Sequence, residues 1–161
     1  MSTDETTYSM QQAQEKLAKM YFNSVWDLLE KTDRTPEDDE AMIHAAHASC
    51  YLWMQVGTPV NHQRGEWQVA RVYTILGHYA AAVRHANRCL ELTVQNSDQM
   101  QDFDQAFAYE CVARANAIAG NRQVAQKYIK LAEEAGEEIK DDEDRKVFFD
   151  NFNSGLWNGM K

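Results

Sequence analysis

The sequence predicts an all-α fold of about seven helices, and three observations support this prediction. Apolar residues recur at helical spacing along most of the chain. Only two prolines and seven glycines interrupt its 161 residues. Alternating β-branched runs are missing, and no Asn-Gly or Asp-Gly turn lies between apolar segments. With 44% apolar residues, the chain is long enough for one domain, over residues 1–161, with a substantial core.

The first predicted hairpin spans about residues 9–56. Its first helix, over residues 9–31, carries one apolar stripe. Thr35 and Pro36 predict the start of the second helix, because a hydroxyl caps a helix and proline suits the first helical position. Gly57 predicts its end. Over residues 41–56 this helix is apolar almost all round, so we expect it to be covered on more than one side. The residues of the first stripe are Leu17, Met20, Tyr21, Val25, Leu28 and Leu29.

The second predicted hairpin spans about residues 59–94. Thr58 precedes another proline and repeats the same start signal. Gly65 lies inside the predicted helix, where glycine costs about 1 kcal/mol relative to alanine. We therefore expect another backbone or side chain to approach closely at this glycine. Gly77 provides the turn to the second helix of the pair.

The third predicted hairpin spans about residues 102–136. Asp102 or Ser97 is the expected cap of its first helix, and Asn121 is the expected cap of its second. Gly136 predicts the end of the second helix.

A last helix is predicted over about residues 142–153, opened by Asp141. It and the residues that follow carry more aromatic and aliphatic side chains than a free amphipathic helix can leave in water. They either cover the exposed end of the preceding hairpin or pair with the same surface of a second subunit, as a homodimer. These side chains are Phe148, Phe149, Phe152, Leu156 and Trp157.

The second and third predicted hairpins share a residue pattern. The earlier one has a small residue at Ala70, an aromatic residue at Tyr73, a turn at Gly77 and small residues at Ala82 and Cys89. Over roughly residues 59–136 the pattern resembles a degenerate tetratricopeptide repeat (TPR). The later hairpin repeats these offsets at Tyr109, Val112, Ala113, Asn116, Gly120, Ala125, Ile129 and Ala132.

The resemblance implies antiparallel hairpins stacked as a right-handed superhelix, with the first helix of each hairpin along a concave groove. A compact helical bundle would use the same amphipathic faces and is the alternative. For the superhelix, the resemblance places the following residues on the groove: Arg64, Trp67, Arg71 and Ile75 from one repeat, and Phe107, Glu110, Arg114 and Ile118 from the next.

These residues favour a noncatalytic scaffold or interaction module that binds a peptide or an acidic group of a protein partner. Arg64, Arg71 and Arg114 would form a basic strip for a carboxylate, because a guanidinium group can engage one through two hydrogen bonds. In the alternative interpretation, the arginines pair with acids such as Glu66 and Glu110 and tie adjacent helices together. The expected binding residues are Asn61, Arg64, Trp67, Arg71, Phe107, Glu110 and Arg114.

Candidates for metal binding or catalysis are few. His44 and His47 project to one side of the second predicted helix and are the candidate metal ligands, together with a carboxylate from elsewhere. Hydrogen bonding between helices is the other use of such histidines. The alternative function is a small-molecule- or metal-binding enzyme that uses the region of His44, His47 and Arg64. No phosphate loop, GxSxG elbow or GxGxxG motif accompanies these residues, which favours a protein without cofactor or catalysis.

Charge and cysteine content indicate the compartment and exclude some partners. A net charge of −9 argues against nonspecific binding of nucleic acid or an anionic membrane. The first ten residues are polar and acidic, unlike a secretory signal, and no apolar run approaches the roughly 18 residues that cross a bilayer. Three widely separated cysteines in apolar contexts are typical of reduced core thiols. We therefore expect a cytoplasmic protein.

Overall fold

The computed structural model describes residues 5–161, which form seven α-helices and no strand. The predicted all-α fold is therefore confirmed for the described part of the chain. None of the helices within these residues is long and apolar enough to cross a membrane. The helices are α1 (Met10–Glu30), α2 (Pro36–Val56), α3 (Pro59–Leu76), α4 (Tyr79–Gln95), α5 (Asp102–Ala119), α6 (Arg122–Glu137) and α7 (Asp142–Phe152).

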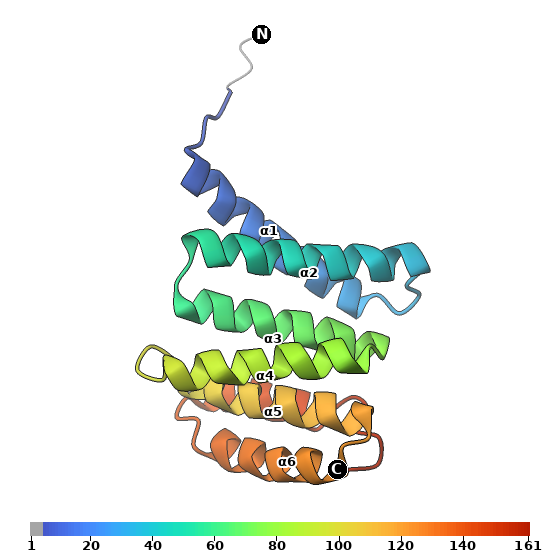
Figure 1. Ribbon diagram of the computed structural model, residues 1–161. Coiled ribbons are helices and arrows are strands. Elements are labelled where there is room, and N and C mark those ends of the chain that lie inside the picture. The colour runs from blue at the N-terminus through green and yellow to red at the C-terminus, as the bar shows by residue number, and fades with distance from the viewer. Residues whose placement is uncertain (1–4) are drawn as a thin grey trace.

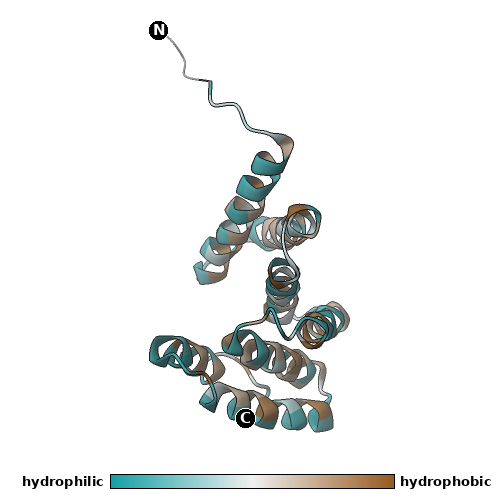
Figure 2. Ribbon diagram, turned by 90° about the vertical axis from the view of Figure 1, so that its left-hand side faces the viewer, coloured by the Kyte–Doolittle hydropathy of each residue, from teal (hydrophilic) through white to brown (hydrophobic). Residues whose placement is uncertain are grey.

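Consecutive helices run back and forth and follow one another in chain order along a column (Figure 1). The most extensive packing lies within the pairs α1–α2, α3–α4 and α5–α6. The first helices of these pairs also contact each other, α1 with α3 and α3 with α5, and α7 packs on α5 and α6. In the turned view of Figure 2, α2, α3 and α4 are seen nearly end-on, with the N-terminal pair at one end of the column and the C-terminal helices at the other.

The Thr-Pro signals begin the helices as predicted. At the start of α2, Thr35 Oγ1 accepts a hydrogen bond from the Asp38 backbone N–H (3.2 Å), and Asp38 Oδ2 accepts one from the Thr35 N–H (2.9 Å). At the start of α3, the side chain of Asn61 accepts a bond from the Thr58 N–H (3.0 Å). Asp141 caps α7 by accepting bonds from the two N–H groups of Glu143 and Asp144. These local bonds satisfy helix donors that have no partner within the helix.

The predicted caps of α5 and the predicted end of α6 were wrong. Gln101, rather than Asp102 or Ser97, precedes α5, and Asp104 in the first turn accepts a bond from the Gln101 N–H (3.0 Å). Asp102 instead accepts a bond from the Lys140 N–H (3.0 Å) and so anchors the loop before α7. Gly136 lies inside α6, which runs on to Glu137. Asp102 and Gly136 looked like local helix signals, but each serves a long-range contact.

The space beside Gly136 explains its position inside the helix. The ring of Phe148 fills the place where a Cβ would stand. Asn121 does precede α6 as predicted, but its side chain makes no capping bond. Its amide instead donates to Asn116 Oδ1 (2.9 Å).

Small residues allow close helix contacts, as predicted. A Cβ on Gly65 would lie 3.2 Å from Cys50 Cα, so α3 approaches α2 almost backbone to backbone. Ala70 and Ala113 are completely buried, the first beside Ala82 and Ala86 of the paired helix.

The C-terminal aromatic residues cover the last hairpin, whereas the aliphatic Leu156 does not. Phe148 and Phe152 are buried against α5 and α6, and Trp157 packs on Phe152 with ring centroids 5.5 Å apart. Leu156 is 81% exposed and does not join them. Gly155, with a φ of +75°, turns the chain there, and the backbone carbonyl of Leu156 lies 3.5 Å from Arg114.

Helix α1 buries less of its stripe than predicted. Val25 is completely buried, but Leu17 and Met20 are 38% and 51% exposed. The first turns of α1 extend beyond the body of the column in Figure 1. Ala18, between Leu17 and Met20 in the sequence, is completely buried, and its carbonyl accepts a bond from Ser49 of α2 (2.8 Å), so α2 covers a different side of α1 from the one that carries Leu17 and Met20. Helix α2 is covered by α1 and α3, as predicted, yet its Tyr51 remains exposed.

Candidate functional site

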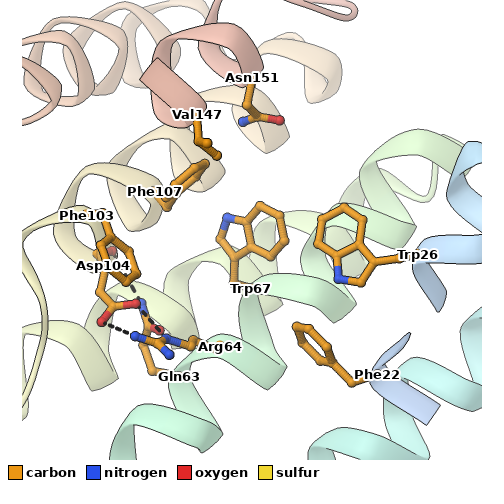
Figure 3. A pocket seen from close by; sticks show the side chains of 10 residues that line it. All are labelled: Phe22, Trp26, Gln63, Arg64, Trp67, Phe103, Asp104, Phe107, Val147 and Asn151. Atoms are coloured by element: carbon orange, nitrogen blue, oxygen red, sulfur yellow. Dashed lines mark hydrogen bonds and ion pairs between the residues drawn. The ribbon is translucent and has the colours of Figure 1, made fainter. Parts of the chain in front are cut away.

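A groove of about 380 Å³ lies between four helices, and we call it the aromatic groove. Helices α1, α3, α5 and α7 supply all of its walls (Figure 3). The residues that line it are Phe22, Trp26, Gln63, Arg64, Trp67, Phe103, Asp104, Phe107, Val147 and Asn151.

A row of aromatic rings connects the four helices along this groove. The ring centroids of Trp26 and Trp67 are 5.7 Å apart, and those of Trp67 and Phe107 are 5.8 Å apart. Phe107 continues the row to Phe148, at 5.1 Å. Such separations are typical of favourable aromatic pairs. Trp26, Trp67 and Phe107 are half-buried, so part of the row remains open to solvent.

Polar atoms without partners lie among these apolar walls. Gln63 Oε1, Trp67 Nε1 and Asn151 Nδ2 are buried, and none has a hydrogen-bond partner among residues 5–161. In Figure 3 the indole nitrogen of Trp67 lies on the side of its ring toward the helix that carries Val147 and Asn151. Buried polar atoms without partners are rare in folded proteins and cost about 1–3 kcal/mol each. Three residues that line the groove therefore each carry one buried polar atom, two donors and one acceptor, without a partner in the described part of the chain.

Gln63 is held firmly in this arrangement. It is 1% exposed, and its amide donates to Thr93 Oγ1 (3.0 Å) and to the Asp104 carbonyl (3.4 Å). Because the nitrogen is engaged on the α4 and α5 side, the amide orientation is determined and the oxygen is left over.

Arg64 forms a two-pronged ion pair at the edge of the groove. Its Nε and one terminal nitrogen donate to the two carboxylate oxygens of Asp104, at 2.9 and 3.0 Å. Its guanidinium also lies 5.2 Å from the ring centroid of Phe103. The Asp104 carboxylate is buried, whereas 42% of the Arg64 side chain is exposed. Arg64 is thus a structural tie whose outer side remains accessible.

The predicted strip of three available arginines is not what the structure shows. Arg71 and Arg114 both bond to one buried carboxylate oxygen of Glu110. Arg114 also donates to the carbonyls of Ser154 (2.9 Å) and Asn151 (3.0 Å) and lies 4.1 Å from the Trp157 ring centroid. A buried guanidinium without a partner would be costly, so the nearest carboxylate and carbonyls engage both groups. Burial also lowers the pKa of Arg71.

The predicted groove residues therefore separate into three places. Arg64, Trp67 and Phe107 do lie on the aromatic groove. Arg71 and Arg114, with Ile75 and Ile118, border a second hollow near the C-terminal tail. Asn61 borders a third, beside Lys19 and Trp53, and Glu110 is buried beneath its arginines. Trp26, Gln63 and Asn151 were not expected at the groove, nor was the buried Phe148 expected at the end of its row of rings. A ring at the matching position of each first helix was the signal that could have indicated Trp26 and Phe148.

His44 and His47, the candidate metal ligands, lie in different environments. His44 is exposed, whereas His47 is half-buried and its Nε2 lies 2.9 Å from the hydroxyl of Tyr73. Burial, followed by the nearby His85, lowers the pKa of His47. His47 therefore makes a hydrogen bond between helices, which was the alternative prediction for these histidines. Among residues 5–161, the group with metal-ligating geometry is a different one, Cys50, His62 and Glu66.

No family model, curated protein or solved structure matches this chain.

Proposed function

We propose that this protein is a noncatalytic, TPR-like interaction module that binds a peptide segment of a protein partner in the aromatic groove. The observation that carries the proposal is the combination of an open row of rings with three buried polar atoms that lack partners in the described part of the chain. Aromatic rings provide apolar contact area, and the unpaired atoms provide fixed hydrogen-bonding positions. Protein interfaces rely on such buried anchors more than on total area.

A TPR-like right-handed superhelix is part of this proposal. The successive contacts of α1, α3, α5 and α7 support it, because first helices line the concave side of such arrays. The rings at positions 26, 67, 107 and 148 add to this support, since each first helix presents one at a similar interval. A repeated interval indicates a repeated structural unit.

A peptide matches the chemistry of the groove because its backbone alternates acceptors and donors. A backbone carbonyl would accept from Trp67 Nε1 or Asn151 Nδ2, and a backbone N–H would donate to Gln63 Oε1. A large apolar side chain of the peptide would pack against the exposed parts of the Trp26 and Trp67 rings. An acidic side chain would meet the exposed side of Arg64, whereas Arg71 and Arg114 have no part in this proposal.

The three cysteines are free and buried, which supports the further proposal of a reducing, cytoplasmic location.

Selection of binders from a random peptide library with the full chain tests the function. Selected peptides should bind the wild type and the Tyr51→Ala variant equally, because Tyr51 is exposed on α2 outside the groove. Binding to Phe107→Ala and Trp26→Ala should fall by tenfold or more, since each substitution removes a ring from the groove. Circular dichroism must show that both variants remain folded. Equal binding by all four folded proteins would refute the groove as the site.

A further inference from the structure

A second site is formed where α2, α3 and α4 meet, on residues that the peptide groove does not use. Cys50 comes from α2, and His62 and Glu66 come from α3. One ligand atom from each lies within 4.8 Å of the other two. His62 and Glu66 are four residues apart, so both project from one side of α3. Thiolate, imidazole and carboxylate are the three ligand types that zinc takes in proteins.

The carboxylate of Glu66 is already positioned between two imidazoles. Its Oε1 lies 3.5 Å from His62 Nε2, and its Oε2 lies 2.6 Å from Nδ1 of His85 on α4. The His85 ring is in turn stacked on Tyr73, with centroids 5.8 Å apart. Ligands at metal sites are typically oriented by such outer hydrogen bonds. His85 therefore holds the far oxygen of Glu66 and leaves the near one for an ion.

Gly65 makes this grouping possible. A Cβ at position 65 would stand 3.0 Å from Cys50 Sγ, so any larger residue would push the thiol aside. The glycine lies next to Glu66 in the sequence, and it brings the α2 thiol up to the carboxylate side of α3. The costly mid-helix glycine thus has a consequence for ligand placement.

The site has an open side and a closed side. Cys50 is 5% exposed, whereas the side chains of His62 and Glu66 are 17% and 11% exposed. An ion can therefore enter past the imidazole while the thiol is protected beneath it. Without an ion, burial and the nearby Glu66 raise the pKa of Cys50 to about 12, so the thiol is neutral. A bound divalent cation would displace that proton, as it does at other thiolate sites.

We propose that Cys50, His62 and Glu66 bind one zinc-like divalent ion, with His85 orienting Glu66 and the fourth coordination position left to water. Three protein ligands with an open position are typical of zinc sites that exchange a ligand. Ordinary zinc–ligand lengths require the three atoms to move together by about 1 Å. The mixed sulfur, nitrogen and oxygen ligands disfavour magnesium and calcium, which prefer oxygen alone. A bound ion would join α2 to α3 and so link the first two hairpins.

Titration of the full, metal-free chain with Co²⁺ tests the site, because cobalt reports its ligands through absorption. We expect one Co²⁺ per chain, with a thiolate charge-transfer band and the strong visible bands of four-coordination, both abolished by added Zn²⁺. Cys50→Ser should lose the charge-transfer band. Cys89→Ser is the matched control, since Cys89 is also completely buried but lies outside the cluster, and it should keep the band.

Variants of the histidines distinguish the proposed ligand, His62, from His85, which orients Glu66. His62→Ala should weaken Co²⁺ binding by more than tenfold, and His85→Ala by about 10–100-fold through loss of orientation. His44→Ala, an exposed histidine on α2, should bind as the wild type does. A folded wild type that gives no charge-transfer band overturns the proposal, whatever the variants do. Retention of the band in Cys50→Ser, or equal weakening by His44→Ala, also overturns it.

Discussion

Helix α3 has two differently built sides, and neighbouring residues show the contrast. Trp67 lies in the aromatic groove, where rings leave open apolar surface and where three polar atoms have no partner among residues 5–161. Glu66, the preceding residue, lies in the cluster with Cys50, His62 and His85, where polar groups contact one another. Adjacent residues on a helix point about 100° apart, so one helix can serve both regions.

We therefore expect substitutions in the cluster to change stability and substitutions in the groove to change binding. In the cluster, each polar group is a partner of another, so removing one leaves a buried group unpaired and lowers stability. At the groove, the buried polar atoms have no partner among residues 5–161, so removing one of them leaves no other group unpaired and is expected to lower affinity instead. The row of rings contributes to stability mainly at its end in the core, where Phe148 is completely buried.

The largest expected effect concerns that buried end of the row. Phe148→Ala should destabilise the protein by about 3–5 kcal/mol, because it removes a fully buried ring beside Phe107, Phe149 and Phe152. The midpoint of urea unfolding measures the effect. Val147→Ala, at a groove residue that is 56% exposed, is the control and should change stability by less than about 0.5 kcal/mol. Similar midpoints for the two variants would contradict the placement of α7.

A smaller effect is expected in the cluster. Glu66→Ala should lower stability by about 1–3 kcal/mol, since His85 loses a 2.6 Å partner in a site with little solvent access. Binding of a peptide selected on the wild type should stay within about twofold, because Glu66 does not line the groove. Glu91→Ala, whose carboxylate is 59% exposed, is the matched control without a stability change. Loss of peptide binding in folded Glu66→Ala would show that the two regions are not independent.

The groove should show the reverse behaviour when only a donor is removed. Trp67→Phe keeps an aromatic ring but loses Nε1, which has no partner within residues 5–161. Peptide affinity should fall about tenfold, while unfolding free energy changes by less than about 1 kcal/mol. Isothermal calorimetry and urea unfolding measure the two quantities. Trp53→Phe, on α2 and outside the aromatic groove, is the control for the general effect of this exchange. A peptide that binds Trp67→Phe as well as wild type would show that the indole N–H is not used.

The smallest effect expected is a pH dependence of stability. It arises from Glu66 in the cluster and from His47 of α2, whose ring lies beside that of His85. Burial lowers the pKa of His47 below its ordinary 6.5, so His47 contributes stability above that pH that is lost as pH falls through its folded value. Burial opposes the charge on Glu66, yet the hydrogen bond and charge of His85 and the charge of His62 lower its pKa below 4.5. Its contribution is present above pH 4.5 and is lost as pH falls through the lowered value.

Urea midpoints measured from about pH 7 to about pH 3 should therefore fall in two steps. His47→Gln should remove the upper step and Glu66→Gln the lower one, whereas the groove variant Val147→Ala should keep both. A profile that does not differ between wild type and His47→Gln would contradict the assignment of the upper step.

The sequence alone determined the local parts of this structure. Thr35 and Thr58 precede helices, and Gly77 and Gly120 turn the chain with φ values of +75° and +82°, because these features depend on bonds within about four residues. Burial of Ala70 also followed from a local apolar stripe. Of the groove, Arg64, Trp67 and Phe107 could be predicted from the position of the first helices.

The tertiary structure alone decided which polar side chains pair between helices. Arg64 pairs with Asp104, 40 positions away, and His85 pairs with Glu66, 19 positions away, although several other acids were available to each. Asp102 and Gly136 looked like local helix signals, yet they serve contacts with the loop before α7 and with Phe148. Helix ends are determined by the chain's own neighbouring groups. Pairing between helices depends instead on their relative rotation and spacing, which the packing of buried residues such as Gly65 and Gly136 sets.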